Sequence, residues 1–214
     1  MRAPTVLLAL GLLLAGCGSG HPTTTTTTSS PAPAPVTPVP EGIPLTADYP
    51  ADDEAESPDL GRQEPHRGDG FALDVCGVTF PAPTTEDLLS AGWRNVEDVR
   101  DRHLVTFADA AAATSYVDAV LDAYRACPTH EENGWVTHTE VHPTDLGDQG
   151  GAAATREDAG TGLRITYVVR VGAAVLVSET LGEGGAGPDG TIERNVRADG
   201  RAIAGIVEEM VRLG

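Results

Sequence analysis

The stretch Leu163–Thr180, which reads LRITYVVRVGAAVLVSET, decides the fold of this 214-residue chain. Its two halves, Leu163–Val171 and Ala174–Thr180, are rich in the Val, Ile, Tyr and Thr residues that favour β-strands. Gly172-Ala173 lies between them and predicts a tight turn. Two strands joined by so short a turn run antiparallel. The sequence therefore predicts a β-hairpin in the core of a folded domain.

Further strands and helices flank this hairpin. Alternating apolar and polar or β-branched residues predict strands at Phe71–Val75, Trp135–Val141 and Ala152–Arg156, and a strand or a bent pair of strands over Val96–Phe107. Apolar residues at three- and four-residue spacing predict helices over 109–126 and 192–213, and a Thr cap with a following Gly predicts a short helix over 84–92. Gly200 lies on the apolar side of the last helix, where we expect close packing on the sheet. Hairpins rather than βαβ crossovers connect the strands, so we expect an α+β fold with a mainly antiparallel sheet and two principal packed helices.

The first seventeen residues predict where the protein resides. Arg2 is followed by an apolar run over 6–14, which is too short to span a bilayer as a mature helix and is typical of a secretory signal. The run ends at Leu14-Ala-Gly-Cys17, which resembles the bacterial lipobox. That resemblance implies a signal peptide over 1–16 and a lipid on Cys17, leaving the protein anchored to the extracytoplasmic face of the cell membrane. A plain secretory signal with a chance Cys is the alternative.

Residues 17–70 have the composition of a tether. A Thr/Ser run is followed by closely spaced prolines and then by an acidic stretch, and few apolar side chains are present to offset the entropy of ordering. We therefore expect a disordered tether over 17–70, either O-glycosylated or unmodified, and a folded domain over 71–214.

The charge balance excludes several functions. Acidic residues number 32 and basic residues 14, all of them Arg, for a net charge of −18. No basic stripe exists to neutralise phosphates, so we expect no nucleic-acid partner. No cofactor is predicted either. The pattern Gly-x-Gly-x-x-Gly at 182–187 lacks the strand that a dinucleotide-binding βαβ unit needs after its helix.

Two cysteines remain once Cys17 carries lipid. Cys76 ends a predicted strand and Cys127 ends a predicted helix, and outside the cytoplasm such a pair is expected to be oxidised. We therefore predict one disulfide, between Cys76 and Cys127. A metal or redox pair is the rival interpretation; it is disfavoured because there is no Cys-x-x-Cys and no His beside either residue in the sequence.

The remaining residues offer one candidate metal site and no hydrolase motif. His138, Glu140 and His142 alternate along a predicted strand and share one face, so they are candidate ligands for zinc or another divalent ion. A solvent-facing strand edge explains them equally simply. No catalytic residue is predicted: there is no Gly-x-Ser-x-Gly elbow, Ser115 and Ser178 lie in regular elements, and Glu179 and Asp158 have no evident acid–base partner in the sequence.

Several motifs together carry a family resemblance. They are Leu73-Asp-Val-Cys-Gly77, Phe107-Ala-Asp-Ala-Ala-Ala-Ala113, Tyr124-Arg-Ala-Cys127 and Tyr167-Val-Val-Arg-Val-Gly-Ala-Ala-Val175. Over 71–213 the chain resembles the secreted sensor-type domain of actinobacterial lipoproteins and is more distantly similar to the extracytoplasmic sensor domain of PknH-type receptor kinases. The resemblance implies an antiparallel sheet with packed helices and a cleft for a ligand. The kinase sensor has a second disulfide that this chain lacks.

We therefore expect a non-enzymatic, membrane-tethered domain that binds or senses a ligand or protein of the cell envelope. A small envelope hydrolase and a metal-binding lipoprotein are the alternatives.

Overall fold

The computed structural model describes residues 38–50, 60–68, 70–82, 88–132, 134–158, 162–182 and 191–212, all within one compact unit that spans 33–214. Its elements are β1 (Gly61–Arg67), β2 (Ala72–Val75), β3 (Val78–Pro81), β4 (Leu88–Arg94), β5 (Asp98–Thr106), α1 (Ala110–Ala126), β6 (Thr129–Glu132), β7 (Trp135–Pro143), β8 (Gln149–Glu157), β9 (Leu163–Val171), β10 (Ala174–Gly182) and α2 (Thr191–Val211). These elements confirm the predicted α+β class.

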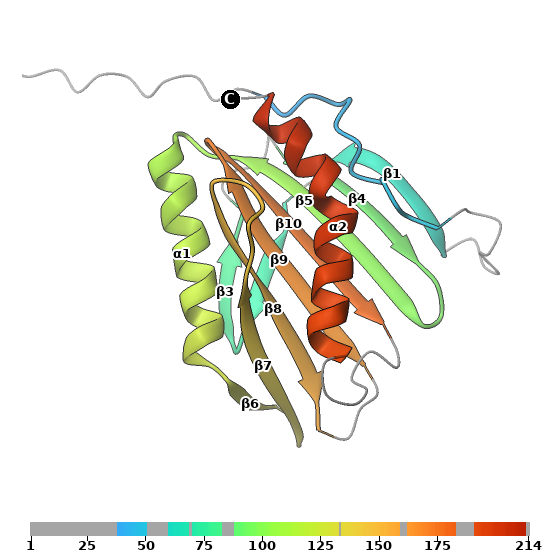
Figure 1. The fold of residues 1–214 in the computed structure, drawn as a ribbon, viewed down its shortest axis with the longest axis vertical. Coiled ribbons are helices and arrows are strands. Elements are labelled where there is room, and N and C mark those ends of the chain that lie inside the picture. The colour runs from blue at the N-terminus through green and yellow to red at the C-terminus, as the bar shows by residue number, and fades with distance from the viewer. Residues whose placement is uncertain are drawn as a thin grey trace, which may run out of the picture. The chain divides into compact units, whose positions relative to one another are not determined.

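One large antiparallel sheet organises the unit. Its described strands follow the order β1-β4-β5-β10-β9-β8-β7-β6, and β2 and β3 form a separate hairpin. The predicted β9–β10 hairpin is confirmed and lies in the middle of the sheet. Helix α2 crosses one face, and α1 and the β2–β3 hairpin lie on the other (Figure 1). Both faces of the central strands are therefore covered.

This double coverage explains the nearly continuous apolar sequence of β9. The buried apolar side chains form two hydrophobic clusters, one on each face of the sheet. Val168 packs in the cluster that includes α1, and its neighbour Val169 packs in the cluster that includes α2. Successive side chains of a strand point to opposite faces, so a strand covered on both sides needs apolar residues at successive positions.

Helix α1 forms as its sequence predicts. The side chain of Asp109 accepts a hydrogen bond from the Ala112 backbone N–H at 2.8 Å, which caps the first turn. The helix ends at Ala126, just before Cys127 and Pro128. Its apolar stripe is buried, with Ala113, Val117, Val120, Leu121 and Tyr124 against the sheet.

Helix α2 approaches the sheet closely at a glycine, as predicted. A Cβ placed on Gly200 would lie 2.7 Å from the Tyr167 hydroxyl oxygen, which is closer than real Cβ atoms come. That hydroxyl donates a hydrogen bond to the Val196 carbonyl at 2.6 Å, so its position is fixed. Gly200 therefore lets the helix backbone rest directly on β9.

The short helix predicted over 84–92 is corrected by the structure. Residues 83–87 lie outside the described residues, and the apolar part of the segment forms strand β4. Leu88 packs in the cluster that includes α1, whereas Leu89 and Trp93 pack in the cluster that includes α2. This two-residue alternation between covered faces suits a strand, and no helix satisfies it.

The folded unit begins before residue 71, which revises the expected extent of the tether. Strand β1 joins the sheet edge, and residues 38–50, which we call the strap, also pack on the domain. Val39, Ile43 and Leu45 of the strap are at most 6% exposed and belong to the cluster that includes α2. The low apolar content of 17–70 as a whole conceals this short apolar run.

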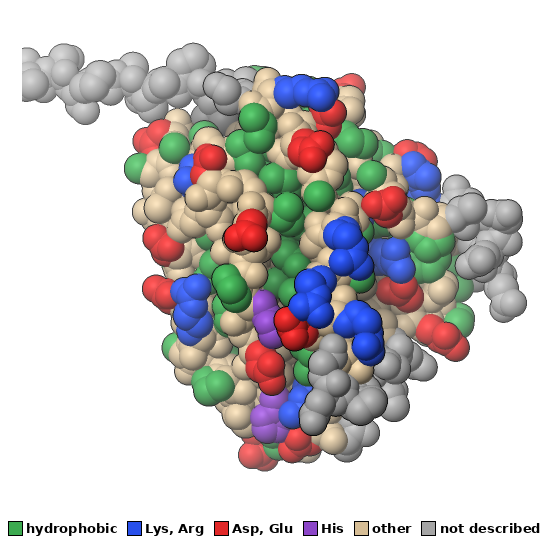
Figure 2. Space-filling view, viewed as in Figure 1, with side chains coloured by type: hydrophobic (Ala, Val, Ile, Leu, Met, Phe, Trp, Pro, Cys, Tyr) green, Lys and Arg blue, Asp and Glu red, His purple; other side chains and the backbone are tan. Residues whose placement is uncertain are grey.

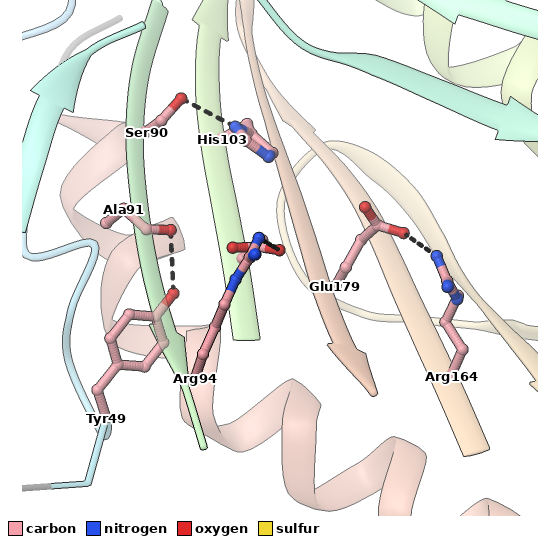
Figure 3. A network of polar contacts seen from close by, with 8 residues as sticks. Tyr49, Ser90, Ala91, Arg94, His103, Arg164 and Glu179 are labelled. Atoms are coloured by element: carbon pink, nitrogen blue, oxygen red, sulfur yellow. Dashed lines mark hydrogen bonds and ion pairs between the residues drawn. The ribbon is translucent and has the colours of Figure 1, made fainter. Parts of the chain in front are cut away.

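Arginine side chains hold the strap in place. The buried Arg102 guanidinium, on β5, donates hydrogen bonds to the carbonyls of Leu45 at 2.7 Å and Ala47 at 2.5 Å. The same guanidinium lies 4.5 Å from the ring centre of Tyr49, a cation–π contact. The Tyr49 hydroxyl donates to the Ala91 carbonyl of β4 at 3.3 Å (Figure 3). Backbone groups with no strand partner are thereby satisfied by side chains.

Candidate functional site

A cleft with both polar and apolar lining lies on the face of the sheet that carries α1, near the end of that helix. Its volume is about 390 Å³. The lining residues come from the β2–β3 hairpin, α1 and strands β6 to β10, and they are Asp74, Val75, Cys76, Gly77, Tyr124, His130, Thr137, Thr139, Thr155, Arg156, Glu157, Gly162, Arg164 and Leu181. This volume is within the range of small-molecule sites.

The β2–β3 turn forms one wall of the cleft. Its two central residues, Cys76 and Gly77, have φ of 53° and 78°, as a two-residue turn between antiparallel strands requires. The Asp74 carboxylate accepts a hydrogen bond from the Gly77 N–H at 3.0 Å and closes the turn. Cysteine is uncommon in the left-handed conformation, and the side chain of Cys76 forms a disulfide.

The predicted disulfide joins this turn to the end of α1. Cys76 and Cys127 are bonded, with their Cα atoms 6.6 Å apart. A ligand nitrogen of His130, at the start of β6, lies within 4.8 Å of both sulfurs. His130 follows Cys127 by three residues and is far from Cys76 along the chain, so adjacency in the sequence does not reveal this neighbour. The spacing Cys127-Pro-Thr-His130 was the signal available for this neighbour.

Threonine hydroxyls form part of the cleft floor. Thr139 on β7 and Thr155 on β8 are paired across the ladder, and their hydroxyls are hydrogen-bonded at 2.9 Å. The Thr137 hydroxyl donates to the His130 carbonyl at 3.3 Å. These residues present methyl groups and oxygen atoms together, a surface that suits a polar ligand with some apolar area.

Charged groups of both signs lie beside the threonines. Arg164 on β9 and Glu179 on β10 form an ion pair at 3.5 Å, seen side by side in Figure 3. The Thr166 hydroxyl also donates to Glu179 at 3.3 Å. Burial raises the pKa of Tyr124, while a side-chain hydrogen bond with Thr166 acts in the opposite direction. Tyr124 is therefore protonated at neutral pH and contributes no charge to the cleft.

The predicted metal ligands His138, Glu140 and His142 lie on β7, and their side chains point to the face of the sheet that carries α2, away from the threonines of the cleft floor. Histidine side chains are visible on that face in Figure 2. His138 is 2.5 Å from the Asp158 carboxylate, and His142 is 3.9 Å from the Glu140 carboxylate. Residues four apart in a strand have Cα atoms about 13 Å apart, so the two imidazoles belong to separate pairs.

The described residues contain a different potential metal group. Among them, Cys76, Cys127 and His130 are the set of three possible ligands whose donor atoms gather within 4.8 Å. Both sulfurs are engaged in the disulfide.

Hydroxyl–imidazole pairs appear in two places that the sequence did not indicate. The Ser90 hydroxyl lies 2.9 Å from His103 Nδ1 (Figure 3). The ring of Phe71 stacks on the His103 imidazole, with the ring centres 4.4 Å apart. Burial lowers the pKa of His103. Thr129 lies 3.3 Å from His138 Nδ1, and Asp158 supplies the acid–base partner that the sequence did not reveal. Each pair joins residues of different elements, so no local pattern announces it.

The two serines considered in the sequence have structural roles. The Ser115 hydroxyl donates to the Ala111 carbonyl within α1 at 2.9 Å, and Ser178 is buried in β10. Cys17 and most of the glycine-rich segment 182–187 lie outside the described residues. Neither described helix combines the length and apolar composition needed to cross a membrane.

No family model matches the chain, and no curated protein matches it in sequence. Among solved structures, the chain is similar to the extracellular domain of PknH from Mycobacterium tuberculosis, with a TM-score of 0.45 and 14% sequence identity. The similarity covers 70% of this chain and 86% of that one. The distant resemblance indicated by the sequence motifs is thus confirmed as a distant structural similarity.

Proposed function

We propose that this protein is a membrane-anchored extracytoplasmic lipoprotein whose folded domain binds or senses a small polar ligand in the cleft, without catalysing a reaction. The observation that carries the proposal is the cleft itself, about 390 Å³ in volume, at the meeting point of hairpin, helix and sheet.

The chemistry of the lining supports binding of a neutral or zwitterionic molecule. Among the described lining residues, Arg164 supplies positive charge and Asp74 and Glu157 supply negative charge, so groups of both signs line the cleft. Arg156 is paired with His138 and Leu163, so its side chain points to the opposite face of the sheet. A molecule rich in hydroxyl or amide groups satisfies such a surface, because it offers donors and acceptors together.

The state of the cleft hydroxyls supports binding rather than nucleophilic catalysis. The Thr139 and Thr155 hydroxyls bond to each other, and the Thr137 hydroxyl bonds to a backbone carbonyl. A nucleophilic hydroxyl needs a base within hydrogen-bond reach. Within the described residues, the hydrolase alternative is favoured by hydrogen bonds that link Thr129 to His138 and His138 to Asp158. The hydroxyl of this arrangement belongs to an exposed threonine rather than to an activated serine.

Two features support an extracytoplasmic, anchored location. The Leu14-Ala-Gly-Cys17 stretch resembles the lipobox, in which a lipoprotein signal is cut just before the cysteine. The Cys76–Cys127 disulfide is of the kind that persists in oxidising compartments outside the cytoplasm.

A thermal-shift screen of the full chain against small-molecule fractions of the cell envelope tests the binding function. A ligand at 100 times its Kd stabilises the protein by about 2.7 kcal/mol. Thr155→Trp fills the cleft floor and should abolish the shift. Thr129→Trp, an exposed position on neighbouring β6, is the matched control and should retain it. A shift that survives Thr155→Trp contradicts the cleft as the binding site, and ester or peptide turnover lost in His138→Ala favours the hydrolase.

The anchor is tested by membrane fractionation. Cys17→Ser should leave the chain unprocessed or release it from the membrane, because serine offers no thiol for the lipid thioether. Normal cleavage and membrane retention of Cys17→Ser would contradict the anchor while leaving the binding function open.

A further inference from the structure

We infer that Cys76, Cys127 and His130 form a binding site for a thiophilic divalent metal ion, of which zinc is the type, when the disulfide is reduced. This inference goes beyond the proposed function, and it requires neither the lipid anchor nor a ligand in the cleft.

The three donor groups are gathered closely enough that small side-chain movements reach the separations a metal ion needs. A tetrahedral zinc ion bound at about 2.3 Å by thiolates and about 2.1 Å by an imidazole holds the sulfurs about 3.8 Å apart and the nitrogen about 3.6 Å from each. In the oxidised protein all three donor atoms lie within 4.8 Å of one another. Once the S–S bond is broken, side-chain rotations of the two cysteines suffice to reach metal geometry, because their Cα atoms are only 6.6 Å apart.

Local structure places each donor independently of the disulfide. Cys127 and His130 belong to one short segment with two residues between them, a spacing that chelates metals in many structural sites. The segment is pinned to β7, because the Thr139 N–H donates to the Pro128 carbonyl at 3.0 Å and the Thr137 hydroxyl donates to the His130 carbonyl at 3.3 Å. This chelating half should persist after reduction.

The hairpin supplies the third donor. Cys76 occupies the β2–β3 turn, whose geometry is fixed by the Asp74–Gly77 hydrogen bond and by the packing of buried Leu73 and Val75 against the cluster that includes α1. Reduction removes the covalent link but leaves this packing, so the turn should stay beside the end of α1.

The site is accessible and has room for a fourth ligand. All three side chains are half-buried rather than fully covered. Cys76 and His130 also line the cleft, so a reductant, a metal ion and a bound water have a path to the site. Two thiolates and one imidazole are soft and borderline donors, which select zinc over magnesium or calcium.

The chemistry balances with a low-molecular-weight thiol as the reductant. Two thiol molecules reduce the protein disulfide to two cysteine thiols and become one disulfide themselves. A divalent ion then binds both sulfurs and one nitrogen of neutral His130, and the two thiol protons are released. In the reverse direction the low-molecular-weight disulfide takes two electrons from the two protein thiolates and, with two protons, returns to two thiol molecules. The protein disulfide re-forms, two donors are lost and the metal ion is released, so metal occupancy follows the thiol–disulfide balance around the protein.

Cobalt titration tests the inference. The full chain carrying Cys17→Ser, purified in detergent without a histidine tag, is reduced with a phosphine and titrated anaerobically with Co²⁺. We expect one equivalent to bind, with a thiolate-to-cobalt charge-transfer band and the visible bands of tetrahedral cobalt. The oxidised chain should show neither signal. Far-ultraviolet circular dichroism should show that the reduced chain remains folded.

Two histidine variants make the test specific. His130→Ala leaves the disulfide intact for purification and should weaken cobalt binding on the order of tenfold or more, because one of three protein donors is lost. His138→Ala, whose imidazole is on the opposite face of the sheet, should bind as the parent does. Equal affinity in His130→Ala and the parent overturns the inference. So does a reduced chain that binds no stoichiometric cobalt, or one that unfolds and is not refolded by the metal.

Discussion

Replacing Asp199 with Asn should stabilise the protein at neutral and alkaline pH. Asp199 lies on α2 and is half-buried, and one of its carboxylate oxygens is buried without a hydrogen-bond partner among the described residues. Burial raises its pKa from 3.8 to about 6, against the opposing effect of a hydrogen bond from the Thr180 side chain; the carboxylate of Asp98 adds a smaller upward contribution. The charged form of Asp199 is therefore unfavourable in the folded protein.

The sign and size follow from this pKa. The folded state binds the Asp199 proton more tightly than the unfolded state, so the contribution of Asp199 to the free energy of unfolding is most favourable below about pH 4 and falls as pH rises from about 4 through 6. Each pKa unit corresponds to about 1.4 kcal/mol, so the full difference is about 3 kcal/mol above pH 7. Asn removes the charge, and its amide oxygen still accepts the hydrogen bond from Thr180. The gain should correspond to roughly 6–12 °C in Tm for a domain of this size.

Thermal unfolding of Asp199→Asn and the parent, followed by circular dichroism at about pH 8 and about pH 4, measures the effect. The gain should be large at the higher pH and under about 1 kcal/mol at the lower, where the carboxyl is protonated in the folded state and about half protonated in the unfolded state. Asp122→Asn, at an exposed position on α1, is the control and should change stability by less than about 0.5 kcal/mol. An equal gain at both pH values, or a loss at pH 8, would refute the burial argument.

Three further predictions test the packing of the fold by chemical denaturation. Gly200→Ala should destabilise the protein by about 1–3 kcal/mol, because the new Cβ meets the fixed Tyr167 hydroxyl. Gly205→Ala has open space around the new Cβ and should stabilise the protein by about 0.5–1 kcal/mol. Two changes of the same sign would contradict this packing. Arg102→Met should lower the free energy of unfolding by about 2–4 kcal/mol, because it leaves the Leu45 and Ala47 carbonyls without donors. Limited proteolysis should then cut the strap. Resistance to the protease equal to the parent's would show that the strap is held by its apolar residues alone. Cys127→Ala should cost about 2–5 kcal/mol, and an unchanged denaturation midpoint would deny the disulfide a stabilising role.

The sequence alone specified the elements whose signals are local. The β9–β10 hairpin follows from β-branched residues around Gly172, and α1 follows from the Asp109 cap and an apolar stripe at helical spacing. The disulfide follows from the cysteine count, since setting Cys17 aside as the predicted lipid site leaves a single pair. Each inference needs only neighbouring residues, or a count, and none depends on how distant segments meet.

Only the tertiary structure decided the remaining features, because each depends on which segments lie side by side. Leu88 and Leu89 form a strand because both faces of the sheet are covered at that point. The strap is ordered because a buried Arg102, far along the chain, donates to its carbonyls. His130 comes to lie beside Cys76 because α1 carries Cys127 back to the hairpin. Local periodicity determines which residues are apolar in an element, whereas long-range contacts determine what that element packs against.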